Sequence, residues 1–305
     1  MKSFERYFVC AILFSLFLIE PLFCADWPLD MTVSKSSAAK ASSPTIRYNF
    51  AENREGCFVQ GFVFSSPESD VKAFSQGKII YKNDASSLYY EDFPSALGSS
   101  LIVAHPDKMI SVYSNLSELK DSSFEDGKVE TGSVIAKVSP DFEGLGGFHA
   151  KNETLEFQVI DTQSHVAINS YIILPKIQNR PLVYPGSLYM QNKKGTIYSL
   201  DERKVLPNGF YSIYRDFSAG RMPLSTSVFV NGKNISTINY DMLISKNGLC
   251  QAGGKNNYPF STIFALPKKQ FLGDVQLIRG KNEITLTVTD FDKNERKITY
   301  VIDIY

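Results

Sequence analysis

Histidine, tryptophan and cysteine are scarce in this chain of 305 residues, and its net charge is zero. It contains 3 His, 1 Trp and 4 Cys, and its 32 Lys and Arg balance 32 Asp and Glu. The balanced charge argues against nucleic acid as a partner, because that binding relies on basic side chains that neutralise phosphates. Any zinc centre would have to take its imidazole ligands from His105, His149 and His165.

Long apolar runs are absent after the first two dozen residues. A positively charged start followed by the apolar stretch 8–19 is typical of a secretory signal peptide that is too short to span a membrane. We expect cleavage after residues 1–24 and export to the periplasm or cell envelope, with no transmembrane segment in the mature chain. Cys24 could instead carry a lipid anchor, although Phe23 is a poor match to the small residue that lipoprotein processing prefers.

Two cysteines, Cys57 and Cys250, remain if the signal peptide is removed. Two thiols in an exported protein could form a disulfide. They lie in different predicted domains, however, and sequence alone does not bring them together. Two free thiols are therefore an equally open alternative.

Helical periodicity is scarce, while short apolar runs alternate with Gly, Asn and Asp turns, which predicts an all-β protein. Strands are expected at 46–50, 58–64 and 166–174. Asn231-Gly232 between apolar runs predicts a two-residue hairpin. A second hairpin, with strands at 280–290 and 297–304 and its turn at 292–294, is predicted near the end of the chain.

Four blocks between Gly98 and Val159 follow one another in a distinctive order. They are a strand ending in His105, the segment Tyr113-Ser-Asn-Leu-Ser, the segment Gly127-Lys-Val-Glu-Thr-Gly-Ser-Val-Ile, and the strand Thr154-Leu-Glu-Phe-Gln-Val. This order resembles the LytM/lysostaphin-type zinc peptidases of bacterial cell walls, family M23. The resemblance covers about 56–175 and implies an antiparallel β-sheet whose polar face forms a groove.

The residues that carry the chemistry of family M23 are replaced. Asn115 stands where the family has its middle histidine, and Thr154 and Glu156 stand where it has His-x-His. The stretch 61–70 lacks the first histidine ligand, and Asp70 is too close to the next strand to match the family's aspartate. The resemblance therefore implies a degenerate peptidase domain that has lost its zinc site and has no cofactor or catalytic residue.

Side chains in the strand 154–159 alternate between two faces. The apolar face carries Leu155, Phe157 and Val159. Thr154, Glu156 and Gln158 occupy the face that forms the groove floor in the resemblance, with Asn115 beside it. His149, in a Gly-rich loop, could also face the groove. This polar face is either a solvated sheet surface or a metal-free groove that binds a glycan or peptide strand.

The chain divides into four parts on this interpretation. They are a signal peptide at 1–24, a linker at 25–55, the M23-like domain at 56–176, and a second domain at 177–305. A Gly-x-Asn-x-Ile-x-Leu-x-Val-x-Asp segment near the end resembles the last hairpin of bacterial immunoglobulin-like domains, which implies a β-sandwich.

The leading hypothesis is an exported, non-catalytic M23-like pseudoenzyme that binds peptidoglycan or regulates a cell-wall remodelling enzyme. One alternative is an active metallopeptidase, a peptidoglycan endopeptidase with a diverged metal site. A second alternative, which depends mainly on the C-terminal sandwich, is a structural or adhesive envelope protein.

Overall fold

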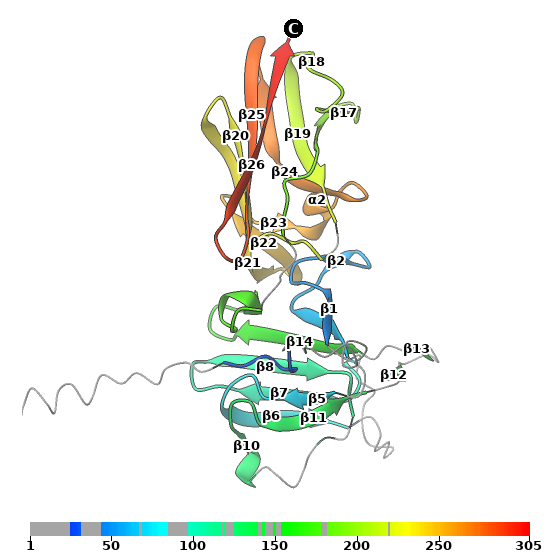
Figure 1. Ribbon diagram of the computed structural model, residues 1–305, viewed down its shortest axis with the longest axis vertical. Coiled ribbons are helices and arrows are strands. Elements are labelled where there is room, and N and C mark those ends of the chain that lie inside the picture. Colours follow the sequence, from blue (N-terminus) through cyan, green and yellow to red (C-terminus); the bar gives the residue numbers. More distant parts are fainter. Residues whose placement is uncertain are drawn as a thin grey trace, which may run out of the picture.

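The computed structural model describes residues 25–31, 44–66, 69–84, 97–117, 119, 125–139, 142–143, 149–150, 154–177, 182–218 and 220–305. The molecule is elongated, with one half below and one half above in Figure 1. Strands dominate both halves, so the all-β prediction is confirmed. Among the described residues, helix is limited to α2 (Phe260–Ile263) and two short 3₁₀ turns, at Glu125–Gly127 and Ser170–Ile172. None of the helices in the described part of the chain is long and apolar enough to cross a membrane.

The lower half is built on antiparallel strands that lie side by side in the order β10, β6, β7, β8, β14 and β4, with β1 beyond β4. Their bounds are β1 Thr45–Tyr48, β4 Phe62–Ser65, β6 Gly77–Asn83, β7 Ser100–Ala104, β8 Met109–Ser114, β10 Lys128–Val129 and β14 Thr154–Asp161. A second, smaller sheet consists of β5 (Asp70–Lys72), β11 (Val134–Val138) and β9 (Leu116–Ser117). The short pair β12 (Phe142–Glu143) and β13 (His149–Ala150) lies apart from both.

The core of the lower half follows the predicted alternation of β14. Leu155, Phe157 and Val159 are fully buried. The Phe157 ring lies 5.3 Å from the Tyr113 ring and 5.7 Å from the Phe74 ring, measured between centroids. The apolar face predicted from sequence is therefore the face that packs.

The segment before β1 differs from the predicted linker. Trp27 is 5% exposed and Leu29 is buried as well. The Trp27 indole packs edge-on against Phe64 and Tyr171, and its Nε1–H donates to the Pro175 carbonyl oxygen at 2.7 Å. The large apolar area of an indole favours this burial over exposure in a linker. Residues 1–24, with the predicted signal peptide and Cys24, lie outside the described residues.

The single strand predicted at 58–64 is instead divided. Its first part, β3 (Cys57–Phe58), pairs back onto β2 (Asn53–Arg54) in a hairpin. Glu55 and Gly56 both have positive φ (53° and 88°), which is the backbone that a two-residue type I′ turn requires. The chain then leaves the hairpin through Gly61 and begins β4. The strand predicted at 166–174 is likewise shorter, because the 3₁₀ turn at Ser170–Ile172 follows β15.

The upper half has two sheets that enclose a core of their own. One sheet is β17–β16–β19–β24, and the other contains β21, β20, β25, β26 and β18 in that order. The first has β16 Leu188–Asn192, β17 Ile197–Ser199, β19 Gly209–Asp216 and β24 Lys269–Leu277. The second has β18 Val205–Leu206, β20 Ser225–Val230, β21 Lys233–Lys246, β25 Gly280–Thr289 and β26 Glu295–Ile304. Asn231 and Gly232 have φ of 50° and 76°, so the predicted hairpin is confirmed.

Strand pairing continues across the predicted boundary between the two halves. β15 (Val166–Ile168) pairs with β14 on one side and with β21 on the other, so one sheet runs through both halves. The larger core cluster also contains buried residues from both halves, among them Phe157 and Leu243. The boundary after residue 176 stays a prediction, but the two halves share a sheet and a core.

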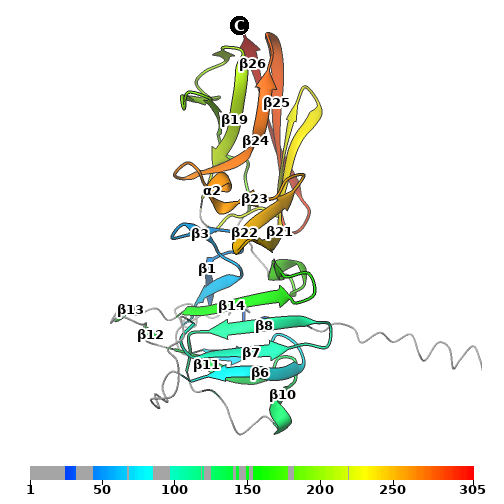
Figure 2. The same cartoon turned by 180° about the vertical axis from the view of Figure 1, so that it is seen from behind.

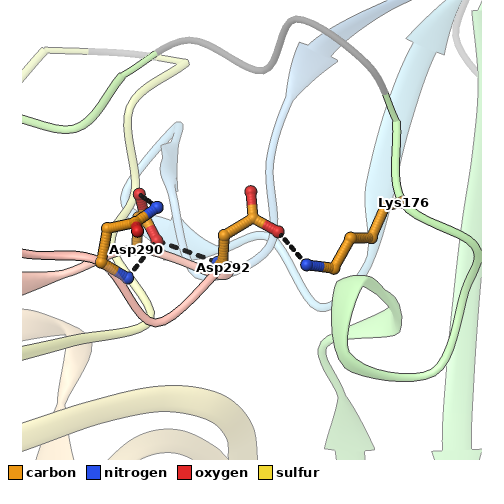
Figure 3. Close-up of polar contacts among 4 residues, drawn as sticks. Lys176, Asp290 and Asp292 are labelled. Carbon is orange, nitrogen blue, oxygen red and sulfur yellow. Dashed lines mark hydrogen bonds and ion pairs between the residues drawn. The ribbon is translucent and has the colours of Figure 1, made fainter.

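Polar contacts reinforce this junction. The Lys176 ammonium lies 2.7 Å from the Asp292 carboxylate, and Figure 3 marks this ion pair with a dashed line. The Asp290 carboxylate accepts from the backbone N–H groups of Asp292 and Asn294, which holds the predicted turn between β25 and β26. An ion pair this exposed contributes little energy, roughly 0–1 kcal/mol.

Candidate functional site

A cavity of about 360 Å³ opens between the β2–β3 hairpin and the polar face of β14. We call it the hairpin groove. Its wall is formed by hairpin residues that include Arg54 and Cys57, and its floor contains Glu156 and Gln158. Two of the predicted groove residues therefore line a cavity, together with Arg54 and Glu55, which the sequence analysis assigned to the end of the linker.

An ion pair joins the wall of the hairpin groove to its floor. Arg54 Nη1 lies 2.5 Å from Glu156 Oε1, and the two side chains are 36% and 27% exposed. The Arg54 guanidinium also lies over the Tyr48 ring, 5.7 Å from its centroid. A partly exposed pair of this kind keeps unused donors and acceptors that remain available to a polar ligand.

Gly61 shapes the other end of the groove. A Cβ at Gly61 would lie 2.0 Å from the Phe157 carbonyl oxygen and 2.8 Å from Gln158 Cγ, so any side chain there would collide with β14. This close approach of two backbones holds the hairpin connection against the floor of the groove. Glycine is required here because no Cβ fits between the two backbones. A left-handed backbone is not the reason, since φ at Gly61 is not positive.

The polar face of β14 is not a uniform groove floor. Thr154 is only 5% exposed, and Ser114, which pairs opposite Glu156, is 3% exposed. Ser100, the partner of Ser114 on β7, is fully buried. The end of the face that carries Thr154 is thus covered, while Glu156 and Gln158 stay accessible. Of the three predicted positions, Glu156 and Gln158 line the hairpin groove, whereas Thr154 is covered and is not among its lining residues.

Asn115 has a backbone role. Its φ is +64°, in the left-handed region that asparagine tolerates better than most residues. Its N–H donates to the Leu97 carbonyl oxygen, and its own carbonyl accepts from the Ser139 N–H. It therefore forms the turn that links β8 to β9 and ties two neighbouring segments to that turn.

His105 is buried and both of its ring nitrogens are engaged. Nδ1 lies 2.8 Å from the Gln76 carbonyl oxygen, and Nε2 lies 2.9 Å from Ser111 Oγ. The Ser111 and Tyr113 hydroxyl oxygens are 3.1 Å apart, and Tyr113 accepts from the Phe74 N–H. A carbonyl oxygen can only accept a hydrogen bond, so Nδ1 of His105 carries a proton. Burial lowers the pKa of the His105 ring, which favours its neutral form. This ring is a structural part of the core.

Asp70 and His165 are not among the described residues that line the hairpin groove. Asp70 is exposed at the start of β5, opposite Lys137, and His165 lies in the turn before β15 with φ of +56°. The backbone of His149 lies in β13, but its side chain and the Gly-rich loop at 144–147 are outside the described residues. Among the residues that the structure describes, no three His, Cys, Asp or Glu side chains come close enough to share a metal ion.

A zinc ion does not fit the residues found at the family positions. Asn115 is held in a turn, Thr154 is covered, and the Glu156 carboxylate is paired with a guanidinium. A zinc ion bound by Glu156 would be repelled by the Arg54 cation beside it. Within the described part of the chain, the groove floor offers hydrogen-bonding groups to a ligand, and no histidine is among the residues that line it.

Arg54 is a residue of the hairpin groove that the sequence analysis did not single out, because the stretch that contains it was interpreted as a linker. The local signal was Gly56, because glycine tolerates the positive φ that a tight turn requires. The partner of Arg54 is 102 positions away in the chain, at Glu156, so no local pattern could identify it.

Comparison with known proteins gives distant similarities. A protein-family model matches residues 183–305, and no curated protein matches the chain. The SpoIIQ–SpoIIIAH pore-forming complex is 18% identical, with 52% of this chain and 94% of that chain covered and a TM-score of 0.35. The catalytic domain of the prophage-encoded M23 protein EnpA from Enterococcus faecalis is 14% identical, with coverages of 40% and 83% and a TM-score of 0.29. The deep-sea M23 metalloprotease pseudoalterin is 13% identical, with coverages of 78% and 99% and a TM-score of 0.29.

The similar structures thus include M23 peptidases and SpoIIQ, all at low TM-scores. The fold and the groove by themselves define an all-β protein in two halves joined by a shared sheet. Its accessible polar cavity lies between a tight hairpin and the central strand β14.

Proposed function

We propose that the protein is an exported, non-catalytic M23-like binding protein of the cell envelope, and that it recognises peptidoglycan peptides in the hairpin groove. The observation that carries this proposal is the cavity of about 360 Å³ lined by a cation, a carboxylate and an amide, Arg54, Glu156 and Gln158. These groups match the carboxylates, amines and amides of a short peptide.

The mode of binding follows from the exposure of the ion pair. A peptide carboxylate would compete for the Arg54 guanidinium, a peptide ammonium would compete for the Glu156 carboxylate, and Gln158 would hydrogen-bond an amide. Each exchange replaces one charged hydrogen bond by another, so the net gain is small and affinity depends on several contacts together. We therefore expect weak binding to single peptides, and the test uses isolated sacculi because they present such peptides at high density.

The test is co-sedimentation of the purified protein with isolated sacculi. Changing Glu156→Leu should preserve the thermal transition and weaken binding at least several-fold. The matched control is Glu295→Leu, which removes a similar exposed ion pair with Lys297 in the upper half, and it should bind like the wild type. If the protein folds normally and Glu156→Leu binds as well as the control, the groove is not the binding site.

A charge-swap variant separates ligand recognition from support of the fold. The double change Arg54→Glu with Glu156→Arg keeps an ion pair but reverses its direction. Stability should be nearly retained, while sacculus binding should fall. Specific capture of a cell-wall enzyme, with no sacculus binding by the wild type, would replace the peptidoglycan proposal by the regulatory one.

The active-peptidase alternative is tested in the same preparation. The protein is incubated with excess Zn²⁺ and sacculi, or with glycine-rich cross-bridge peptides, and soluble products are measured. We expect no hydrolysis. Cleavage that a chelator stops, and that a change at His149 or Glu156 abolishes, would establish the metallopeptidase instead.

A further inference from the structure

The two thiols of the described chain lie on opposite sides of the predicted domain boundary. Both are free, with Cys57 exposed on β3 and Cys250 half-buried on β22 (Leu249–Gly254). Cys57 belongs to the hairpin of the lower half, and Cys250 belongs to the sandwich of the upper half. Both ribbon views place this hairpin beside β22 and beneath α2 (Figures 1 and 2).

Aromatic packing fixes the hairpin to the region of Cys250. Phe58, the residue after Cys57, has its ring centroid 5.4 Å from that of Phe260 and 6.0 Å from that of Phe264. The edge-on angles of 80° and 65° are the preferred geometry for such pairs. The hairpin is therefore held against α2.

Strand register carries the argument from α2 to the second thiol. β22 pairs antiparallel with β23 (Tyr258–Pro259), and Gln251 lies opposite Pro259. Cys250 comes just before Gln251, and Phe260 comes just after Pro259. Because the two strands are antiparallel, Cys250 and Phe260 lie at the same end of this short ladder. The backbone positions of Cys57 and Cys250 are thus linked through the Phe58–Phe260 contact, because Cys57 precedes Phe58 in the chain and Cys250 lies at the Phe260 end of the ladder.

The electrostatics agree with this placement. The pKa of the Cys250 thiol is raised, first by burial and then by the nearby charge of the Cys57 thiolate. A thiol acts on another in this way only at short range, because solvent screens the interaction over longer distances. Cys57, which is exposed, is the thiol that a solution oxidant reaches first.

We propose that Cys57 and Cys250 form a disulfide under oxidising conditions, and that this bond ties the β2–β3 hairpin to the upper half. The oxidant is a disulfide of the glutathione class or the active disulfide of a thiol oxidase. The Cys57 thiolate attacks one sulfur of the oxidant and expels the other as a thiolate. Cys250 then loses its proton and attacks the Cys57 sulfur, which releases the second thiol. Two protein thiols become one disulfide, and one oxidant disulfide becomes two thiols.

The bond would act directly on the hairpin groove, because Cys57 lines the cavity and is the cross-strand partner of Arg54. Oxidation would fix the wall that carries the cation, and reduction would leave the hairpin held by packing alone. This consequence for binding rests on the proposed function, whereas the disulfide itself does not.

The experiment equilibrates the reduced full chain in glutathione buffers of increasing oxidised fraction, then traps the thiols by alkylation and maps the peptides by mass spectrometry. Cys10 and Cys24 are followed on their own peptides. The expected result is a linked pair of peptides containing Cys57 and Cys250 in a monomeric chain, with loss of both thiols. Oxidation should also raise the thermal midpoint. The proposal is overturned if full oxidation yields only glutathione adducts at these cysteines, or only links between chains.

Two variants test the packing argument. Cys57→Ser should leave Cys250 unlinked except as a glutathione adduct. Phe58→Ala should loosen the hairpin and lower the equilibrium constant for the disulfide several-fold. Phe210→Ala is the matched control, because Phe210 is an exposed aromatic residue on β19, and it should leave the constant unchanged. Equal constants in the two phenylalanine variants would contradict the argument that packing brings the thiols together. Sacculus binding is not used as a readout, so failure of the proposed function leaves this test intact.

Discussion

Changing Trp27→Ala should destabilise the protein strongly, although Trp27 lies in a stretch that resembles a linker. The indole is 5% exposed, and it packs on Phe62, Phe64 and Tyr171 with centroid separations of 5.8, 6.2 and 5.7 Å. Removing a buried Trp side chain costs about 3–5 kcal/mol through lost transfer energy and the cavity left behind. That is a large fraction of the roughly 5–15 kcal/mol that holds a typical domain folded.

Trp27→Phe separates the hydrogen bond from the packing. Phenylalanine retains much of the aromatic surface but leaves the Pro175 carbonyl oxygen without its donor, which lies at 2.7 Å in the native protein. Pro175 is exposed, so water can replace the lost donor and only the net value of the hydrogen bond, about 0.5–1.5 kcal/mol, is at stake. This variant should therefore lie between the wild type and Trp27→Ala. The ordering of the three proteins follows from the structure alone.

The assay is urea unfolding followed by far-ultraviolet circular dichroism, with the midpoint and slope fitted together. Because Trp27 is the only tryptophan of the chain, its fluorescence in the native protein should be blue-shifted and should move to the red in the same transition. The exposed Phe210→Ala serves as a control and should change stability by less than about 1 kcal/mol. A similarly small loss in Trp27→Ala, or red-shifted native emission, would refute the placement of this segment in the core.

Three further outcomes are expected. The pKa of the Glu52 carboxyl is raised above its ordinary value of 4.5, mainly by burial. The protonated carboxyl therefore stabilises the folded state most below pH 4.5, and this stabilisation should be lost as the pH rises through the raised pKa. Thermal midpoints between roughly pH 4 and 8 should therefore depend on pH less in Glu52→Gln than in the wild type, and parallel curves would contradict this. Gly61→Ala should cost about 1–3 kcal/mol and weaken sacculus binding, since its Cβ would lie 2.0 Å from the Phe157 carbonyl oxygen; unchanged unfolding midpoints would argue against that contact. Residues 180–305 alone should still unfold cooperatively, because the second core cluster lies within them. They should also bind a hydrophobic dye at the surface that the lower half covers in the full chain. A non-cooperative transition would show that the halves fold only together.

Local patterns in the sequence determined the elements that depend on near neighbours. The alternation in the strand 154–159 identified the buried face, and Asn231-Gly232 identified a type I′ hairpin with both residues at positive φ. The all-β class followed from the same periodicity. These predictions succeed because period-two burial and turn conformations are set by residues only a few positions apart.

Only the tertiary structure decided how distant segments meet. Arg54 reaches Glu156 across 102 positions, β15 pairs with β21 across the predicted boundary, and Phe58 of the lower half packs on Phe260 of the upper half. The same packing covers Thr154 while leaving its strand neighbour Glu156 open, although both lie on one polar face. The period of the apolar pattern predicts which face of the strand a side chain lies on, but it does not predict which distant segment covers that face. Coverage depends on long-range packing, and that is why the groove had to be found in the folded protein.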